Sequence, residues 1–272
     1  MTKKEENRRV CSNINLLDRA VGLPSKTLNK KGEYDDGNGF TIVALNKDIN
    51  LPTTFDKKIL YYILFKVQQR VLTHKPTLED PSYGVHFPSI NKALKEMGLA
   101  DTTQYRDAWK RAIIRWGNTE LIYKKGNWYF GSGKYNTGVL HYRPVVGYEE
   151  DGSYILLHDT FVNASKDIFS RHLPLDQILK LKTPLSLRLF EVLCKSFHKA
   201  GTWEIGLEKL TSKLGCGKVF PKDMKKNIQK ATDHISENTY LQVVASFKEN
   251  NVVIFTKLET GEREEYYDEA EG

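Results

Sequence analysis

Five lysines lie close together between residues 218 and 230, and a glutamine lies among them. These residues are Lys218, Lys222, Lys225, Lys226, Gln229 and Lys230. Ammonium groups at this density attract phosphate, and Lys and Gln side chains can donate hydrogen bonds to base edges in the major groove of DNA. Lysines on an outward helix face are more commonly only solvated. Whether the cluster binds DNA therefore depends on the secondary-structure element that contains it.

Apolar residues recur through this segment at a helical spacing, at Met224, Ile228, Ala231 and Ile235. They predict a helix over residues 222–235 with one buried stripe, and the cationic residues fall on its opposite side. An earlier helix, capped near Asp101 and ending near Trp116, follows the same plan. Tyr105, Trp109, Ala112 and Trp116 form its inner stripe, and Thr103, Arg106, Lys110 and Arg111 point outward.

Each of these helices runs into a predicted pair of strands. Lys124 and Lys125 occupy the turn between strands at 120–123 and 128–130, and Lys248 occupies the turn between 240–247 and 252–258. Such turns can contact the DNA backbone or minor groove beside a helix in the major groove. We therefore add Lys124, Lys125 and Lys248 to the candidate DNA-binding residues.

The two halves of the chain repeat one pattern. Residues Ile90, Ala93, Met97 and Gly98 match Leu207, Leu210, Leu214 and Gly215 in order and spacing, and the tetrapeptides 118–121 and 238–241 both read Asn-Thr-x-Leu. A helix, a short helix, a Gly-centred turn, a longer helix and a hairpin are the order of a winged helix. The sequence predicts an α+β fold of two tandem winged-helix domains.

We divide the chain into four parts. These are a polar, loosely held arm (1–39), a first winged helix (40–165), a second winged helix (166–258) and a disordered acidic tail (259–272). The tail holds seven acids against one base, which leaves 40 basic and 27 acidic residues, or +13, over residues 1–258. A basic body with an acidic end is typical of a polyanion binder.

Several other classes of protein are disfavoured. No apolar run is long enough for a membrane span or a signal peptide, which predicts a cytoplasmic or nuclear protein without a membrane partner. The three cysteines show no metal-binding spacing, and neither a phosphate-binding Gly-rich loop followed by a helix nor a His-x-His pair occurs. We expect no metal, no cofactor and no enzymatic activity.

The chain resembles plasmid replication initiators of the RepA type over residues 40–258. The most specific similarity is the run Pro184–Leu193, and it is followed at family-like spacing by Ile205-x-Leu207-x-x-Leu210 and Phe220-x-x-Asp223-Met224-Lys225-x-x-Ile228. In the first half, the run Leu51–Leu60 is similar to that group. The arm and the acidic tail match nothing in the family.

The resemblance implies binding to directly repeated sites (iterons) in double-stranded origin DNA, opening of an AT-rich segment, and contact with the host helicase and initiator. It also implies that the second domain supplies most base recognition, while the first domain takes part in dimerisation. Two alternatives stay open at this point. A tandem winged-helix transcription regulator or phage repressor would make the same DNA contacts, and a nuclease would require metal-dependent cleavage.

Overall fold

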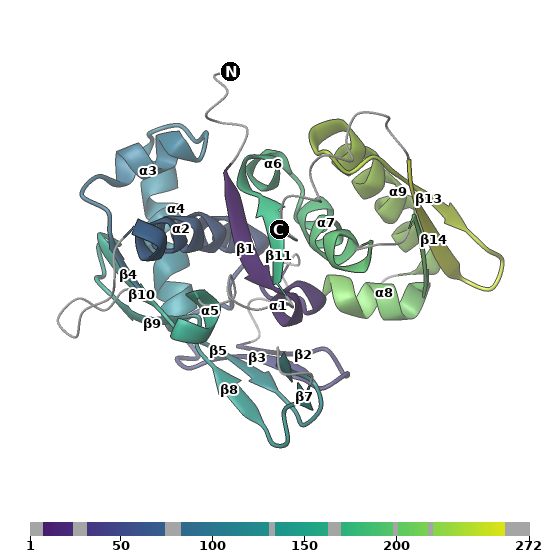
Figure 1. The fold of residues 1–272 in the computed structure, drawn as a ribbon, viewed down its shortest axis with the longest axis horizontal. Coiled ribbons are helices and arrows are strands. Elements are labelled where there is room, and N and C mark those ends of the chain that lie inside the picture. Colours follow the sequence, from purple (N-terminus) through teal and green to yellow (C-terminus); the bar gives the residue numbers. More distant parts are fainter. Residues whose placement is uncertain are drawn as a thin grey trace.

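The computed structural model describes residues 8–23, 32–73, 83–130, 134–162, 170–197, 201–216 and 220–258. One order of elements occurs twice within these residues: a long helix, a short strand, a short helix, a longer helix and two strands (Figure 1). The two copies stand side by side, with a β-sheet layer below the first copy in this view. The predicted α+β fold of two tandem winged helices is confirmed.

The second copy has the simpler course. Its elements are α7 (Pro184–Ser196), β12 (Thr202–Gly206), α8 (Leu207–Leu214), α9 (Pro221–Asn238), β13 (Val243–Phe247) and β14 (Val252–Lys257). Helix α7 begins at Pro184 because Thr183 Oγ1 accepts the Ser186 N–H at 3.1 Å. Strand β14 pairs antiparallel with both β12 and β13, so the hairpin β13–β14 is the wing of this domain.

The first copy repeats this topology. Its elements are α2 (Thr54–Thr73), β4 (Gly84–His86), α3 (Ile90–Glu96), α4 (Thr103–Gly117), β9 (Val145–Tyr148) and β10 (Tyr154–Leu157). Strand β10 lies between β4 and β9, just as β14 lies between β12 and β13. Gly98 after α3 and Gly215 after α8 have φ angles of 71° and 68°, a left-handed turn that favours glycine. The predicted duplication is therefore present at the level of single turns.

A separate sheet interrupts the first copy between α4 and its wing. It consists of β2 (Glu33–Asp35), β3 (Phe40–Ala44), β5 (Thr119–Tyr123) and β8 (Leu140–Tyr142), in that order. A short ribbon, β6 (Tyr129–Phe130) with β7 (Lys134–Tyr135), lies beside it in the chain.

The hairpin predicted across residues 120–130 is wrong, because β5 pairs with β3 and β8. An alternating pattern identifies a strand but not its partner, and β3 comes from far earlier in the sequence. The wing of the first domain is β9–β10, whose turn contains Glu149, Glu150 and Asp151.

The prediction of a loosely held N-terminal arm is also wrong for the residues that the structure describes. Strand β1 (Arg9–Asn13) pairs with β11 (Ser170–Pro174), and α1 (Ile14–Asp18) packs on α7. Val10 and Leu17 are completely buried. These apolar stretches are too short to show a period among polar neighbours, so the sequence alone reads as an arm.

The remaining elements join the two copies. Helices α5 (Asp159–Val162) and α6 (Leu175–Lys180) lie along the connection. The predicted domain boundary at 165/166 and the acidic tail at 259–272 both fall outside the described residues. The buried residues of both copies belong to one contiguous hydrophobic cluster, so the two winged helices share a core.

Buried charges lie where the two copies meet. Glu191 on α7 accepts hydrogen bonds from Lys57 Nζ at 2.8 Å and Tyr61 Oη at 2.7 Å, both on α2. Arg188 NH1 donates to the same carboxylate at 2.8 Å and to the Leu17 carbonyl oxygen. Burial lowers the pKa of Lys57 to about 8, and the neighbouring Glu191 carboxylate opposes that shift. This network fixes α2, α1 and α7 to one another.

Candidate nucleic-acid interface

Helix α9 is built to present one face outward. Its stripe of Met224, Ile228, Ala231 and Ile235 is buried, and the helix packs on α7 and β13. Pro221 at its first position sets the start, because its fixed φ suits a helix and no N–H is lost there. The opposite side carries Lys222, Lys226 and Lys230, all exposed. The outward placement predicted for these three lysines agrees with the structure.

Lys225 and Gln229 lie at the edge of this face, on the side of the wing. Both are half-buried. Lys225 Nζ lies 6.0 Å from the centroid of the Phe247 ring on β13, a cation–π contact. Gln229 Nε2 donates to Asp233 Oδ1 at 2.9 Å, one turn further along the same helix. Lys225 therefore lies at the junction between helix and wing, and Gln229 follows it by one turn of the helix.

Charge changes sign along the same helix. Its four lysines lie within the first ten residues, together with one exposed acid, Asp223, whereas Asp233 and Glu237 lie exposed further along. Asn227, also exposed, belongs to the first half and was not among the predicted residues, because an amide near the edge of the apolar stripe gives no distinct signal. The N-terminal half of α9 is thus the part suited to approach a polyanion.

The wing of the second domain adds one cation. Lys248 lies in the turn between β13 and β14, exposed, and its Nζ lies 2.9 Å and 3.0 Å from the two carboxylate oxygens of Glu204. An exposed ion pair of this kind contributes little to stability, so the lysine can exchange Glu204 for a phosphate at small cost. Lys218, just before α9, lies outside the described residues.

The first domain presents a weaker version of this surface. On α4, Thr103, Lys110 and Arg111 are exposed, while Arg106 Nε lies 3.7 Å from Asp101. The wing of this domain is acidic, and Trp109 Nε1 donates to the Gly152 carbonyl oxygen at 3.2 Å, which holds the turn against α4. The Ser153 side chain and N–H lower the pKa of Asp151, and Lys110 contributes further. The outward face of α4 therefore lies beside compensating acids.

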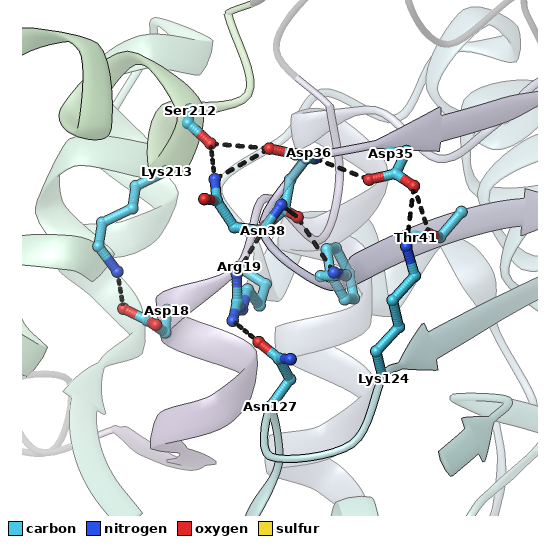
Figure 2. A network of polar contacts seen from close by, with 12 residues as sticks. Asp18, Arg19, Asp35, Asp36, Asn38, Thr41, Lys124, Asn127, Ser212 and Lys213 are labelled. Carbon is cyan, nitrogen blue, oxygen red and sulfur yellow. Dashed lines mark hydrogen bonds and ion pairs between the residues drawn. The ribbon is translucent and has the colours of Figure 1, made fainter. Parts of the chain in front are cut away.

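The turn holding Lys124 and Lys125 is not a wing. Figure 2 shows it beside the loop between β2 and β3, with Lys124 directed at Asp35, where Nζ and Oδ2 are 3.6 Å apart. In the same turn, Asn127 Oδ1 accepts a hydrogen bond from Arg19 at 2.6 Å. The placement expected for Lys124 and Lys125, on a wing next to a recognition helix, is wrong. Their turn follows β5 at the end of the sheet β2-β3-β5-β8, which the sequence pattern did not predict.

The loop between β2 and β3 connects the first domain to the second. Asn38 Nδ2 donates to Ser212 Oγ on α8 at 2.8 Å, and Ser212 Oγ donates to the Asp36 carbonyl oxygen at 3.1 Å (Figure 2). Arg19 NH1 donates to Asp36 Oδ2 at 2.7 Å. Asp18 forms ion pairs with Lys213 on α8 and with Lys195 on α7. The position of α8, which packs against α7 and β12, is thereby tied to the first domain.

Chemistry of other kinds finds little support among the described residues. No three His, Cys, Asp or Glu side chains there gather into a potential metal site. Burial raises the pKa of Cys194 to about 12 and that of Cys216 to about 11, so neither thiol ionises near neutral pH. In the described part of the chain, no helix combines the length and the apolar character that a bilayer span needs.

Comparisons with known proteins address the fold. No family model and no curated protein matches the chain. A selenomethionine structure of domain 2 and domain 3 of RctB matches with a TM-score of 0.56 and 16% identity over 90% of this chain and 96% of that one. A second structure of RctB domains 2–3 matches with a TM-score of 0.50 and 17% identity over 90% and 97%.

A third structure, of the Pi initiator protein in complex with iteron DNA, has a TM-score of 0.43 and 12% identity over 94% and 99%. At this TM-score, the Pi structure does not contribute to the assignment of the fold. The two RctB structures cover nearly the whole of both chains. This chain therefore has the two-domain fold of RctB domains 2 and 3.

Proposed function

We propose that this protein is a replication initiator that binds repeated sites in duplex DNA through its second winged helix. One observation carries the proposal: three exposed lysines of α9, Lys222, Lys226 and Lys230, lie opposite a buried stripe, on the helix that a winged helix places in the major groove. Residues 222–230 carry four lysines against one acid, Asp223, whereas the corresponding helix of the first domain lies beside an acidic wing. The second domain is therefore the main site of base recognition.

The finer parts of the proposal rest on the similarity of the sequence to RepA-type initiators. They are recognition of iterons, opening of an adjacent AT-rich segment, dimerisation through the first domain, and contact with the host helicase and initiator. The shared fold with RctB domains 2–3 is consistent with them and supports only the architecture. We also infer that the protein catalyses no DNA cleavage itself.

The decisive experiment compares two charge reversals of equal size. Footprinting on the DNA upstream of the coding sequence first locates the site, and gel-shift titration then measures affinity. We expect the double variant Lys225→Glu/Lys226→Glu to lose specific binding, because two phosphate- or base-facing cations become repulsive. Lys180→Glu/Lys182→Glu, exposed on and after α6, changes the net charge equally and should bind nearly as the parent does.

The outcomes separate the alternatives. Equal losses in both double variants would assign binding to net charge and refute the α9 interface. Direct repeats in the footprint favour an initiator, whereas a single palindrome favours a transcription regulator or repressor. Nicking of supercoiled plasmid in Mg²⁺ or Mn²⁺ by the purified protein would contradict the non-enzymatic assignment.

A further inference from the structure

The most exposed large apolar side chain among the described residues is Phe220, which is 79% exposed. The next, Val139, is 59% exposed. Single apolar residues on a surface are ordinary and need no partner. Phe220 differs in its position, because it is the N-cap residue of α9, the proposed recognition helix. It lies directly before Pro221 and two residues before Lys222.

The backbone holds this side chain in place. Phe220 has an extended conformation (φ −60°, ψ 137°), and its carbonyl oxygen accepts the Met224 N–H at 3.0 Å, the first hydrogen bond of the helix. Pro221 restricts the conformation of the residue before it as well as its own. The aromatic ring is therefore carried outside the helix at its N-terminal end, and not in the buried stripe.

In a winged helix, the N-terminal residues of the recognition helix are those that contact base edges in the major groove. The apolar group that a base pair presents there is the C5-methyl of thymine. We propose that Phe220 packs on a thymine methyl group at the DNA site and thereby selects a T·A pair. This inference rests on the proposed function, because it requires α9 to lie in the major groove. The lysines that follow Phe220 on α9 hold the backbone and neighbouring bases of the same site.

The test removes the methyl group from the DNA and the ring from the protein. Each thymine of the footprinted site is replaced singly by deoxyuridine, and fluorescence anisotropy measures Kd for the parent and for Phe220→Ala. For the parent protein, deoxyuridine at one particular position of each repeat should raise Kd about four-fold, the effect expected for the loss of one buried methyl group. Phe220→Ala should bind the thymine site more weakly and show no further loss with uracil at that position.

Two further variants make the result specific. Phe220→Leu keeps an apolar side chain and should keep part of the sensitivity to uracil. Leu45→Ala removes another exposed apolar side chain, 49% exposed and directly after β3, and should behave as the parent does. A parent insensitive to uracil at every position, or a Phe220→Ala variant as sensitive as the parent, would overturn the assignment.

Failure here is distinguishable from failure of the proposed function. Lys225→Glu/Lys226→Glu should bind the thymine and uracil duplexes equally weakly, because it has lost specific binding to the site. If that double variant binds normally, the α9 interface itself is wrong. If it binds poorly while Phe220→Ala keeps the parent's response to uracil, only the thymine contact is wrong.

Discussion

At the scale of single residues, the charged side chains divide into those that face solvent and those that hold the molecule together. The lysines on the outward side of α9 belong to the first group. Asp18 belongs to the second, because its carboxylate lies between Lys195 Nζ, at 2.6 Å, and Lys213 Nζ. Substituting the first group should change binding, whereas substituting the second should change stability.

Asp18 also gives the protein a defined response to acid. Burial acts to raise the pKa of its carboxyl group, but attraction to Lys195 and Lys213 outweighs burial and holds the pKa well below its usual value. A carboxyl group with a depressed folded-state pKa stabilises the fold above its unfolded value, about 3.9, and this contribution is lost as pH falls toward the folded value.

We therefore expect Asp18→Asn to lower the free energy of unfolding by about 1–3 kcal/mol at pH 7, and by less at pH 3, where the unfolded-state carboxyl is largely protonated while the folded-state one is still ionised. Urea denaturation of both proteins at the two pH values measures this. Asp48→Asn, in an exposed turn, is the matched control and should change stability by less than about 0.5 kcal/mol at either pH. A deficit of Asp18→Asn that is the same at pH 3 and pH 7 would contradict the role of its charge.

At the scale of elements, two turns that look alike in sequence have different surroundings. In the first turn, Lys124 forms an ion pair with Asp35 of the inserted sheet, which is the sheet β2-β3-β5-β8 between α4 and the first wing. The second turn, with Lys248, belongs to the wing beside α9. We expect Lys248→Ala to weaken DNA binding uniformly across sequences and to reduce the slope of log K against log salt by about 1.

Lys124→Ala is the control for this prediction, because it removes the same charge from a turn outside both wings. It should leave the salt slope unchanged. Anisotropy titrations at four or five salt concentrations give both slopes. A reduced slope for Lys124→Ala and an unchanged one for Lys248→Ala would place the DNA against the inserted sheet instead of the second wing.

These two turns also show what the sequence can predict. Helices α4, α8 and α9 follow from apolar periodicity, and the glycines at their junctions follow from turn chemistry, so both winged helices could be identified. Strand partners could not, because β5 meets β3 through contacts distant in the chain. On α9, Lys222, Lys226 and Lys230 were assigned to the outer face correctly, because apolar periodicity determines which side of a helix is buried. Lys225, predicted to point outward as well, is half-buried against Phe247, a contact from a strand that periodicity within the helix could not predict.

At the scale of the whole molecule, the N-terminal segment joins the two winged helices into one body. Strand β1 pairs with β11 and packs against α2, while α1 packs against α7. Leu17 on α1 is completely buried, next to the charge network of Arg188 and Glu191 that reaches α2. A substitution at Leu17 should therefore destabilise the packing of both winged helices.

We expect Leu17→Ala to cost about 2–5 kcal/mol, the usual range for a buried leucine, and to raise amide hydrogen exchange in α2 and α7 together. Met97→Ala, also in the core but at the end of α3, should cost a similar amount and raise exchange in the first winged helix alone. Hydrogen-exchange mass spectrometry resolves the two patterns. Faster exchange confined to α1 in Leu17→Ala would mean that the segment is an independent attachment, and it would then not hold α4 and α9 in a fixed relation.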